Sequence, residues 1–176
     1  MRTRSLCWVI VVVGLASCGT LGQERRVAIN EIAWGGTVAD RTDEWIELAN
    51  TTGQDVSLAG WKLVSSDGGL AVLLSGTIQA SSFLLLERAD GPSAPTLHPS
   101  LTYHGALTDA GEGLWLIDSD GKVVDTANQE AGRWPAGTNP WGTPPCCSME
   151  RIELAMVASS LYAGTRRLTG GSRPEK

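Results

Sequence analysis

An acidic stretch at residues 43–50, DEWIELAN, holds the side chains whose types and spacing come closest to a catalytic arrangement. Two carboxylates that converge on one substrate can act as acid and nucleophile or base, as they do in glycoside hydrolysis. Here Glu44, Ile46 and Leu48 alternate with other side chains, and such alternation indicates a β-strand. Positions three apart on a strand point to opposite faces, so Glu44 and Glu47 cannot converge. We therefore predict a strand rather than a catalytic pair.

The orientation of this strand follows from its two apolar positions. Ile46 and Leu48 are expected to face the core, which places Trp45 and Glu47 on the outer face. We interpret the acidic residues as a solvated strand edge whose charges discourage pairing with another edge.

Other candidate catalytic and metal-binding residues have weaker support. Asp40 and Asp43, with neighbouring loop carbonyls, offer the clustered oxygens that Ca²⁺ prefers, but no EF-hand spacing accompanies them. His98 and His104, the two histidines, lie in or beside a proline-rich stretch, and the sequence has no nucleophile elbow. We therefore expect no catalytic residue, no bound metal and no cofactor.

The first residues are typical of an export signal. A short basic start precedes an apolar run at residues 6–16, which is too short to span a bilayer permanently. The run ends in LASC, which resembles the bacterial lipobox, where the cysteine is acylated after cleavage. We predict a signal peptide at 1–17, lipidation at Cys18 and a polar tether at 18–25. An ordinary signal peptide with a chance cysteine, or an uncleaved anchor, is the alternative.

A lipid anchor would place the chain outside the cytoplasm, on the bacterial cell membrane or outer membrane. Gly19, rather than Asp, after the cysteine favours the outer membrane. Cys7 would leave with the signal peptide, so Cys146 and Cys147 would remain. A disulfide between adjacent cysteines is strained, so we expect two free or separately buried thiols.

Charge argues against one class of partner. The 176 residues carry a formal net charge of −5, and removal of residues 1–17 takes away two arginines and no acid, which leaves −7. Affinity for phosphate backbones comes mainly from Lys and Arg, so nucleic acid is a disfavoured partner.

The remaining sequence predicts strands joined by turns. Glycine is abundant, with 21 residues, and helical periodicity is missing. An Asp-Gly turn divides the clearest hairpin, and a long proline-rich surface loop is expected at 89–105. Such short strands favour an all-β sandwich at 26–155, and leave 156–176 uncertain. The predicted strands are 26–34, 43–50, 56–66, 70–74, 82–88, the hairpin 113–126 and 148–154.

Several sequence blocks, in order, resemble the lamin tail domain as it occurs in bacterial secreted proteins. These blocks are INEIAW, DEWIELANTTGQDVSLAGWKL, SFLLLER, LTDAGEGLWLIDSDGKVVDTA, GRWPAGTN and SMER, and they run from Val27 to Arg151. The resemblance implies an immunoglobulin-like β-sandwich without catalytic activity. After SMERI the sequence departs from the family pattern, which puts the last strand in doubt.

Tryptophans are the remaining candidates for ligand contact. Trp34, Trp45 and Trp61 lie on or beside predicted strands and are expected to be structural, Trp61 in the core. Trp134 and Trp141 lie in irregular sequence, where they would form an exposed platform or fold back to cap the sandwich. We expect a non-catalytic module that binds an envelope protein or polysaccharide. The alternative is a carbohydrate-binding accessory to an envelope or secreted hydrolase.

Overall fold

The computed structural model describes residues 25–89, 100–143, 145–151 and, for the backbone, 162–167. The predicted signal peptide at 1–17, Cys18 and His98 lie outside these ranges, as does the tether up to residue 24. The described residues form strands and no helix, so none of them forms a helix that could cross a membrane.

The larger sheet has six strands in the order β12-β11-β1-β2-β7-β8. All neighbours are antiparallel except β7 and β8, which run parallel. Its central pair, β1 and β2, therefore has hydrogen-bonded neighbours on both sides. The strands are β1 (Val27–Ala33), β2 (Trp45–Asn50), β7 (Phe83–Arg88), β8 (Leu101–Tyr103), β11 (Cys147–Arg151) and β12 (Tyr162–Arg167).

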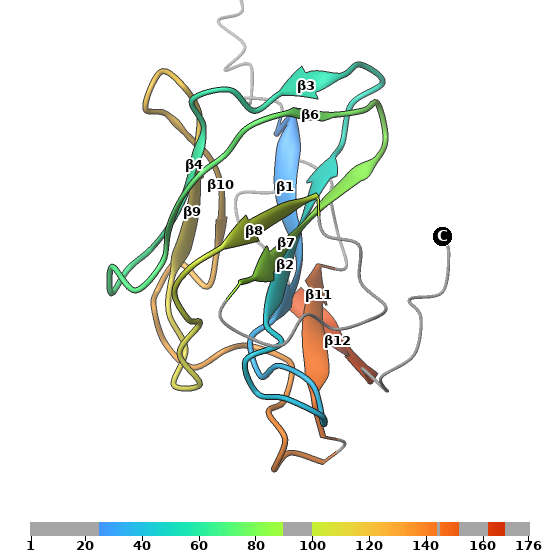
Figure 1. Cartoon of the computed structure of the whole chain (residues 1–176), viewed down its shortest axis with the longest axis vertical. Coiled ribbons are helices and arrows are strands. Elements are labelled where there is room, and N and C mark those ends of the chain that lie inside the picture. The colour runs from blue at the N-terminus through green and yellow to red at the C-terminus, as the bar shows by residue number, and fades with distance from the viewer. Residues whose placement is uncertain (1–24, 90–99, 144, 152–161, 168–176) are drawn as a thin grey trace, which may run out of the picture.

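The second sheet has four strands in the order β10-β9-β4-β5, and it packs against the first (Figure 1). The β9–β10 hairpin confirms the predicted Asp-Gly turn. A short pair, β3 and β6, lies across one end of the two sheets (Figure 1). The strands are β3 (Val56–Ser57), β4 (Lys62–Ser65), β5 (Ala71–Leu73), β6 (Thr77–Ile78), β9 (Leu114–Ile117) and β10 (Val123–Ala127).

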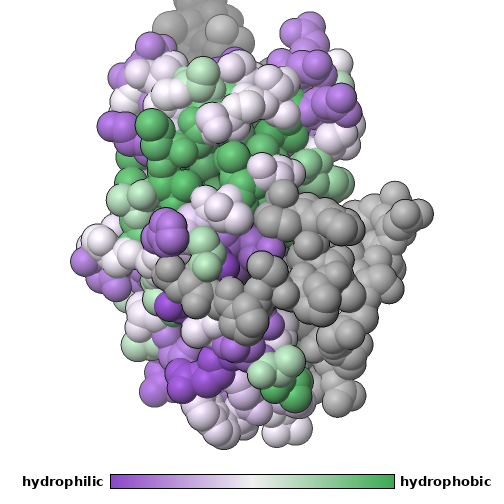
Figure 2. All heavy atoms as spheres, viewed as in Figure 1, coloured by the Kyte–Doolittle hydropathy of each residue, from purple (hydrophilic) through white to green (hydrophobic). Residues whose placement is uncertain are grey.

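The core between the two sheets confirms the all-β, immunoglobulin-like sandwich. Ile46 and Leu48 of β2 face Leu63 of β4 and Leu116 of β9 within one cluster of fully buried side chains. Each fully buried aliphatic side chain contributes about 1.5–3 kcal/mol relative to an exposed one. The expected burial of Trp61 is also confirmed. Figure 2 shows apolar residues gathered on the upper half of one face, and polar residues below them.

The predicted solvated edge at residues 43–50 is wrong. β2 lies between β1 and β7, and both of its faces are covered, so Trp45 and Glu47 are buried. The Glu47 carboxylate is instead an internal acceptor, because Asn30 Nδ2 donates to its Oε1 at 2.6 Å. The alternation of apolar and polar residues is a local feature of one strand. It does not show whether segments distant in the sequence cover the second face of the sheet.

Three further expectations need correction. The predicted strand 70–74 is shorter, β5 (Ala71–Leu73), and lies at the edge of the second sheet, where Leu73 is 71% exposed. The stretch 56–66 forms two strands separated by a turn, and β8 lies inside the predicted loop 89–105. The segment left uncertain beyond residue 155 contributes β12, which pairs with β11.

Candidate binding groove

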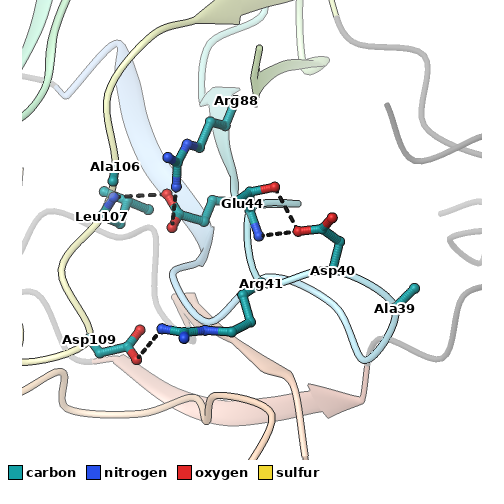
Figure 3. Close-up of a pocket in the computed structure, with 9 residues that line it drawn as sticks. Ala39, Asp40, Arg41, Glu44, Arg88, Ala106, Leu107 and Asp109 are labelled. Carbon is teal, nitrogen blue, oxygen red and sulfur yellow. Dashed lines mark hydrogen bonds and ion pairs between the residues drawn. The ribbon is translucent and has the colours of Figure 1, made fainter. Parts of the chain in front are cut away.

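A groove of about 620 Å³ opens where two connections meet the end of β7 (Figure 3). One is the β1–β2 loop (34–44), and the other is the β8–β9 loop (104–113). Both loops depart from the same end of the sandwich, so residues distant in sequence share one wall. The lining residues are Ala39, Asp40, Arg41, Thr42, Glu44, Arg88, Ala106, Leu107 and Asp109.

Glu44 joins the two loops at the floor of the groove. Its carboxylate is 3.0 Å from Arg88 Nη1 and accepts a hydrogen bond of 2.8 Å from the Leu107 N–H (Figure 3). Burial raises the pKa of Glu44 to about 7, although the Leu107 N–H and Arg88 both favour the charged form. The residue is only 4% exposed. Glu44 is therefore placed to brace the groove rather than to meet a ligand.

Asp40 and Asp43 stabilise the β1–β2 loop from within. Asp40 Oδ1 accepts hydrogen bonds from the N–H and the hydroxyl of Thr42, and these donors lower the pKa of Asp40. Asp43 Oδ2 accepts a hydrogen bond of 2.7 Å from the Thr37 hydroxyl, while burial raises the pKa of Asp43. Local side-chain bonds of this kind are common in turns. In the described part of the chain, no group of three or more acidic, His or Cys side chains could hold a metal.

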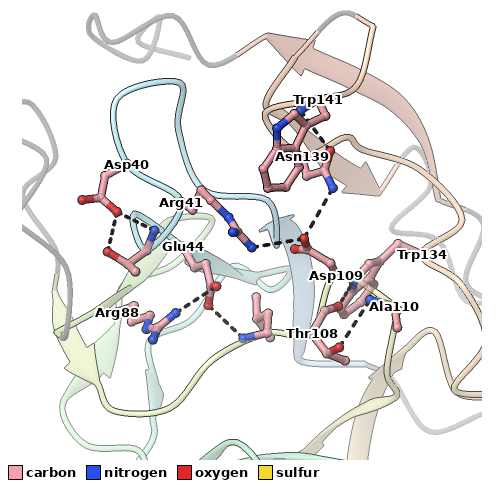
Figure 4. Close-up of polar contacts among 12 residues, drawn as sticks. Asp40, Arg41, Glu44, Arg88, Thr108, Asp109, Ala110, Trp134, Asn139 and Trp141 are labelled. Atoms are coloured by element: carbon pink, nitrogen blue, oxygen red, sulfur yellow. Dashed lines mark hydrogen bonds and ion pairs between the residues drawn. The ribbon is translucent and has the colours of Figure 1, made fainter.

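The rim of the groove carries an exposed aromatic platform. The Arg41 guanidinium lies 4.6 Å from the ring centroid of Trp141, and Arg41 Nη2 is 3.6 Å from Asp109 Oδ2 (Figure 4). Asn139 Nδ2 donates to the same Asp109 oxygen at 3.4 Å, and its own Oδ1 accepts from the Trp141 N–H. The Arg41–Asp109 ion pair is exposed and therefore adds little stability. Together with the contacts of Trp141 and Asn139, it aligns three separate loops.

The structure separates the two tryptophans predicted as a platform. Trp134 is buried, stacks on Trp34 with ring centroids 6.1 Å apart, and donates its indole N–H to the Thr108 carbonyl at 2.8 Å. It therefore caps the sandwich and offers no face to a ligand. Trp141 is 69% exposed and alone retains the platform geometry.

The remaining candidate residues lie apart from the groove rim. Glu47 is buried with Asn30 on β1, away from the contacts that Glu44 makes. His104 lies on the surface, before the stretch of the β8–β9 loop that lines the groove. Cys146 and Cys147 are buried and do not form a disulfide with each other, as expected. No sequence pattern predicts that Arg41, Arg88 and Asp109 line one groove. Their contacts join positions more than 40 residues apart and depend on how the loops are placed.

The comparison with known families fits this fold. Residues 22–131 match the family model described as Lamin Tail Domain, from before β1 to after β10. The chain belongs to the lamin tail domain family. No curated protein matches this sequence. The blocks GRWPAGTN and SMER lie beyond the matched residues, although SMER forms most of β11 in the larger sheet.

Lamin tail domains are non-enzymatic, immunoglobulin-like modules, which agrees with the sandwich described above. In this lamin tail domain the groove loops fall inside the matched range, whereas Trp141 follows it. The platform therefore joins Arg41 and Asp109, inside the matched range, to Trp141, which follows it.

Proposed function

We propose that this lamin tail domain is a non-catalytic binding module that recognises a component of the bacterial cell envelope through the rim at Trp141. One observation carries the proposal: Trp141 presents one open ring face while Arg41 holds the other, with Asp109 and Asn139 beside it. A rigid aromatic ring beside a few fixed polar groups suits recognition, because little conformational freedom is lost on binding.

The roles of the groove carboxylates support binding rather than chemistry. Asp40 and Asp43 accept hydrogen bonds from groups of their own loop, and Glu44 accepts hydrogen bonds from Leu107 of the facing loop and from Arg88 of β7. Their oxygens therefore hold the walls in place. The bound component would meet Trp141 and the exposed parts of Arg41 and Asp109.

The proposal includes an extracytoplasmic, lipid-anchored location. Its support is the sequence alone: the basic start, the apolar run at 6–16 and the LASC tetrapeptide that ends at Cys18. Replacement Cys18→Ser is expected to abolish fatty-acid incorporation and to release the protein from the membrane fraction. Cys7→Ser, a matched control in the same segment, is expected to change neither result. Equal labelling of the two variants would refute the anchor.

A polysaccharide is the favoured alternative to an envelope protein as the bound component. Exposed tryptophan faces stack on the apolar faces of sugar rings. An adjacent Asn side chain can donate hydrogen bonds to sugar hydroxyls, and an adjacent Asp carboxylate can accept hydrogen bonds from them. In this version the chain serves an envelope or secreted hydrolase as an accessory module. Nucleic acid is disfavoured by the acidic charge.

A pull-down of envelope fractions with the full-length protein tests the proposal and distinguishes its two versions. Recovered material is analysed by mass spectrometry and by carbohydrate analysis at two salt concentrations. One protein recovered at both concentrations supports an adaptor, and glycan supports the accessory module. Recovery of neither would contradict the proposed function.

A further inference from the structure

The outer face of the second sheet, which points away from the core, carries mostly apolar side chains. Residues that pair directly across neighbouring antiparallel strands lie on the same face, so the register identifies its members. One row crosses the four strands and consists of Leu73 on β5, Lys62 on β4, Ile117 on β9 and Val123 on β10. Leu73 is 71% exposed and Val123 is 46% exposed, although polar residues usually occupy the outer positions of a sandwich.

A second row on the same face contains a tryptophan that lies along the sheet. The row consists of Ala71, Val64, Trp115 and Thr126. A Cβ at Gly113 would lie 2.7 Å from the Trp115 ring, so this ring occupies the place of a side chain at Gly113. The ring therefore extends the apolar surface instead of projecting from it. We call these two rows the apolar face.

A partner for the apolar face must also suit Lys62, which is exposed and is the one charged residue of that face. A second copy packed face to face would bury two Lys62 ammonium groups, and the apolar face has no carboxylate to pair with them. A lipid surface offers anionic headgroups beside apolar acyl chains, so it suits both the ammonium group and the apolar side chains. Tryptophan, as at position 115, is enriched where proteins meet the membrane–water interface.

The beginning of the described chain lies beside this face. Arg25 Nε is 2.7 Å from Asp125 Oδ1 on β10, which is the edge strand that also carries Val123. Residues 18–24 can span at most about 25 Å, at about 3.6 Å for each residue. A lipid anchor at Cys18 would therefore hold the β10 edge of the apolar face close to the bilayer. The groove loops lie at the other end of β1, the lower end in Figure 1.

We propose that the apolar face lies on the surface of the lipid bilayer that holds the anchor. The inference rests on the lipid-anchored location in the proposed function, and not on binding at Trp141. A flat face of partly exposed side chains binds a bilayer weakly by itself, so the anchor must supply a high effective concentration. The apolar face therefore adds little when the protein in detergent binds envelope fractions. Its effect is to orient the anchored protein, with the groove end left open to a partner.

Tryptophan fluorescence of the full-length lipoprotein in vesicles tests the contact. The vesicles contain phosphatidylethanolamine and phosphatidylglycerol, with bromine on part of the acyl chains to quench any tryptophan that touches them. Flotation of the vesicles measures the anchor, and quenching measures the apolar face. Wild type is expected to float and to be quenched. Trp115→Phe is expected to lose most of the quenching, whereas Trp141→Phe, at the groove end, is expected to lose none.

A matched pair of substitutions separates the apolar face from other exposed surface. Val123→Asp places a carboxylate on the face, and Val38→Asp makes the same change in the β1–β2 loop. Both positions are exposed, so both variants are expected to keep the fold. Val123→Asp is expected to float like wild type but to lose the quenching of Trp115. Val38→Asp is expected to retain both flotation and quenching.

The possible results distinguish the apolar face from the anchor. Protein that floats without quenching, or Val123→Asp that is quenched like wild type, overturns the inference and leaves the anchor intact. Protein that does not float overturns the anchor and the inference together. Sedimentation in detergent gives a further test. A dimer that Val123→Asp dissociates would assign the apolar face to a second copy of this chain, and would also overturn the inference.

Discussion

The carboxylate of Asp125 on β10 accepts a hydrogen bond from the N–H of Ile29 on β1 at 2.7 Å, and so joins the two main sheets. The pairing of β1 with β2 shifts register between Ile29 and Glu31, which marks the irregularity where this cross-sheet bond forms. Arg151 on β11 donates to the same Asp125 oxygen at 2.7 Å and to the Ile29 carbonyl at 2.9 Å. These three residues fix the relative position of the sheets, and thus of the loops that line the groove.

Replacement Asp125→Ala is expected to destabilise the fold by about 3–5 kcal/mol, because it leaves the fully buried Arg151 guanidinium without its carboxylate. The measurement is urea denaturation of the two proteins. Asp120→Ala, in the exposed β9–β10 turn, is expected to change stability by less than about 0.5 kcal/mol. If both variants lose the same amount, the cross-sheet role of Asp125 is wrong.

Stability is expected to fall as pH rises through neutrality, partly because of Glu44. Its folded-state pKa of about 7 exceeds the ordinary value of 4.5, so the folded state holds this proton more tightly than the unfolded state. The resulting contribution is complete below pH 4.5 and lost as pH rises through 7, and it is on the order of 3 kcal/mol. Denaturation of Glu44→Gln across this range is expected to show a flatter pH profile than wild type. Parallel profiles would contradict the buried role of Glu44.

Trp134 and Trp141, seven residues apart, are expected to differ sharply in their effect on stability. Trp134→Ala removes the stack on Trp34 and the bond to Thr108, and is expected to cost about 3–5 kcal/mol. Trp141→Ala removes an exposed ring and is expected to cost less than about 1 kcal/mol. Chemical denaturation of both variants measures their free energies of unfolding. An equal loss of stability in the two variants would contradict the buried role of Trp134 and the exposed role of Trp141.

Gly111 is expected to be intolerant of a side chain. Its φ of +96° is unfavourable for other residues, and a Cβ there would lie 2.1 Å from the Gly132 carbonyl oxygen. Gly111→Ala is therefore expected to destabilise the protein by about 2 kcal/mol or more. Gly53→Ala, where a Cβ meets no atom within 4 Å, is the control and is expected to cost little. A thermal melt in which both variants match wild type would contradict the close approach.

The sequence predicted the fold better than the groove. Alternation in β2 and the Asp-Gly turn of the β9–β10 hairpin are local features, and they correctly indicated strands of a sandwich. The burial of Glu47 was missed because it depends on which distant segments cover the outer face of the larger sheet. The contacts of Glu44 with Arg88 and Leu107 join positions 44 and 63 residues apart, and no spacing rule connects them.

The two tryptophans show the same limit. Both lie in the proline-rich connection between β10 and β11, and the composition of this stretch predicts the same two alternatives for each, an exposed platform or a cap on the sandwich. Only the placement of that loop against Trp34 and Arg41 distinguishes the buried ring from the exposed one.

The central claim, that the rim at Trp141 binds an envelope component, is tested most directly by the Kd of Trp141→Ala for fractionated cell envelope. Leu73→Ala is the matched control, because Leu73, on the edge strand β5, is an apolar residue about as exposed as Trp141. We predict at least about tenfold weaker binding for Trp141→Ala, with a denaturation curve close to that of wild type, and unchanged binding for Leu73→Ala. Wild-type affinity in a folded Trp141→Ala protein would contradict the account.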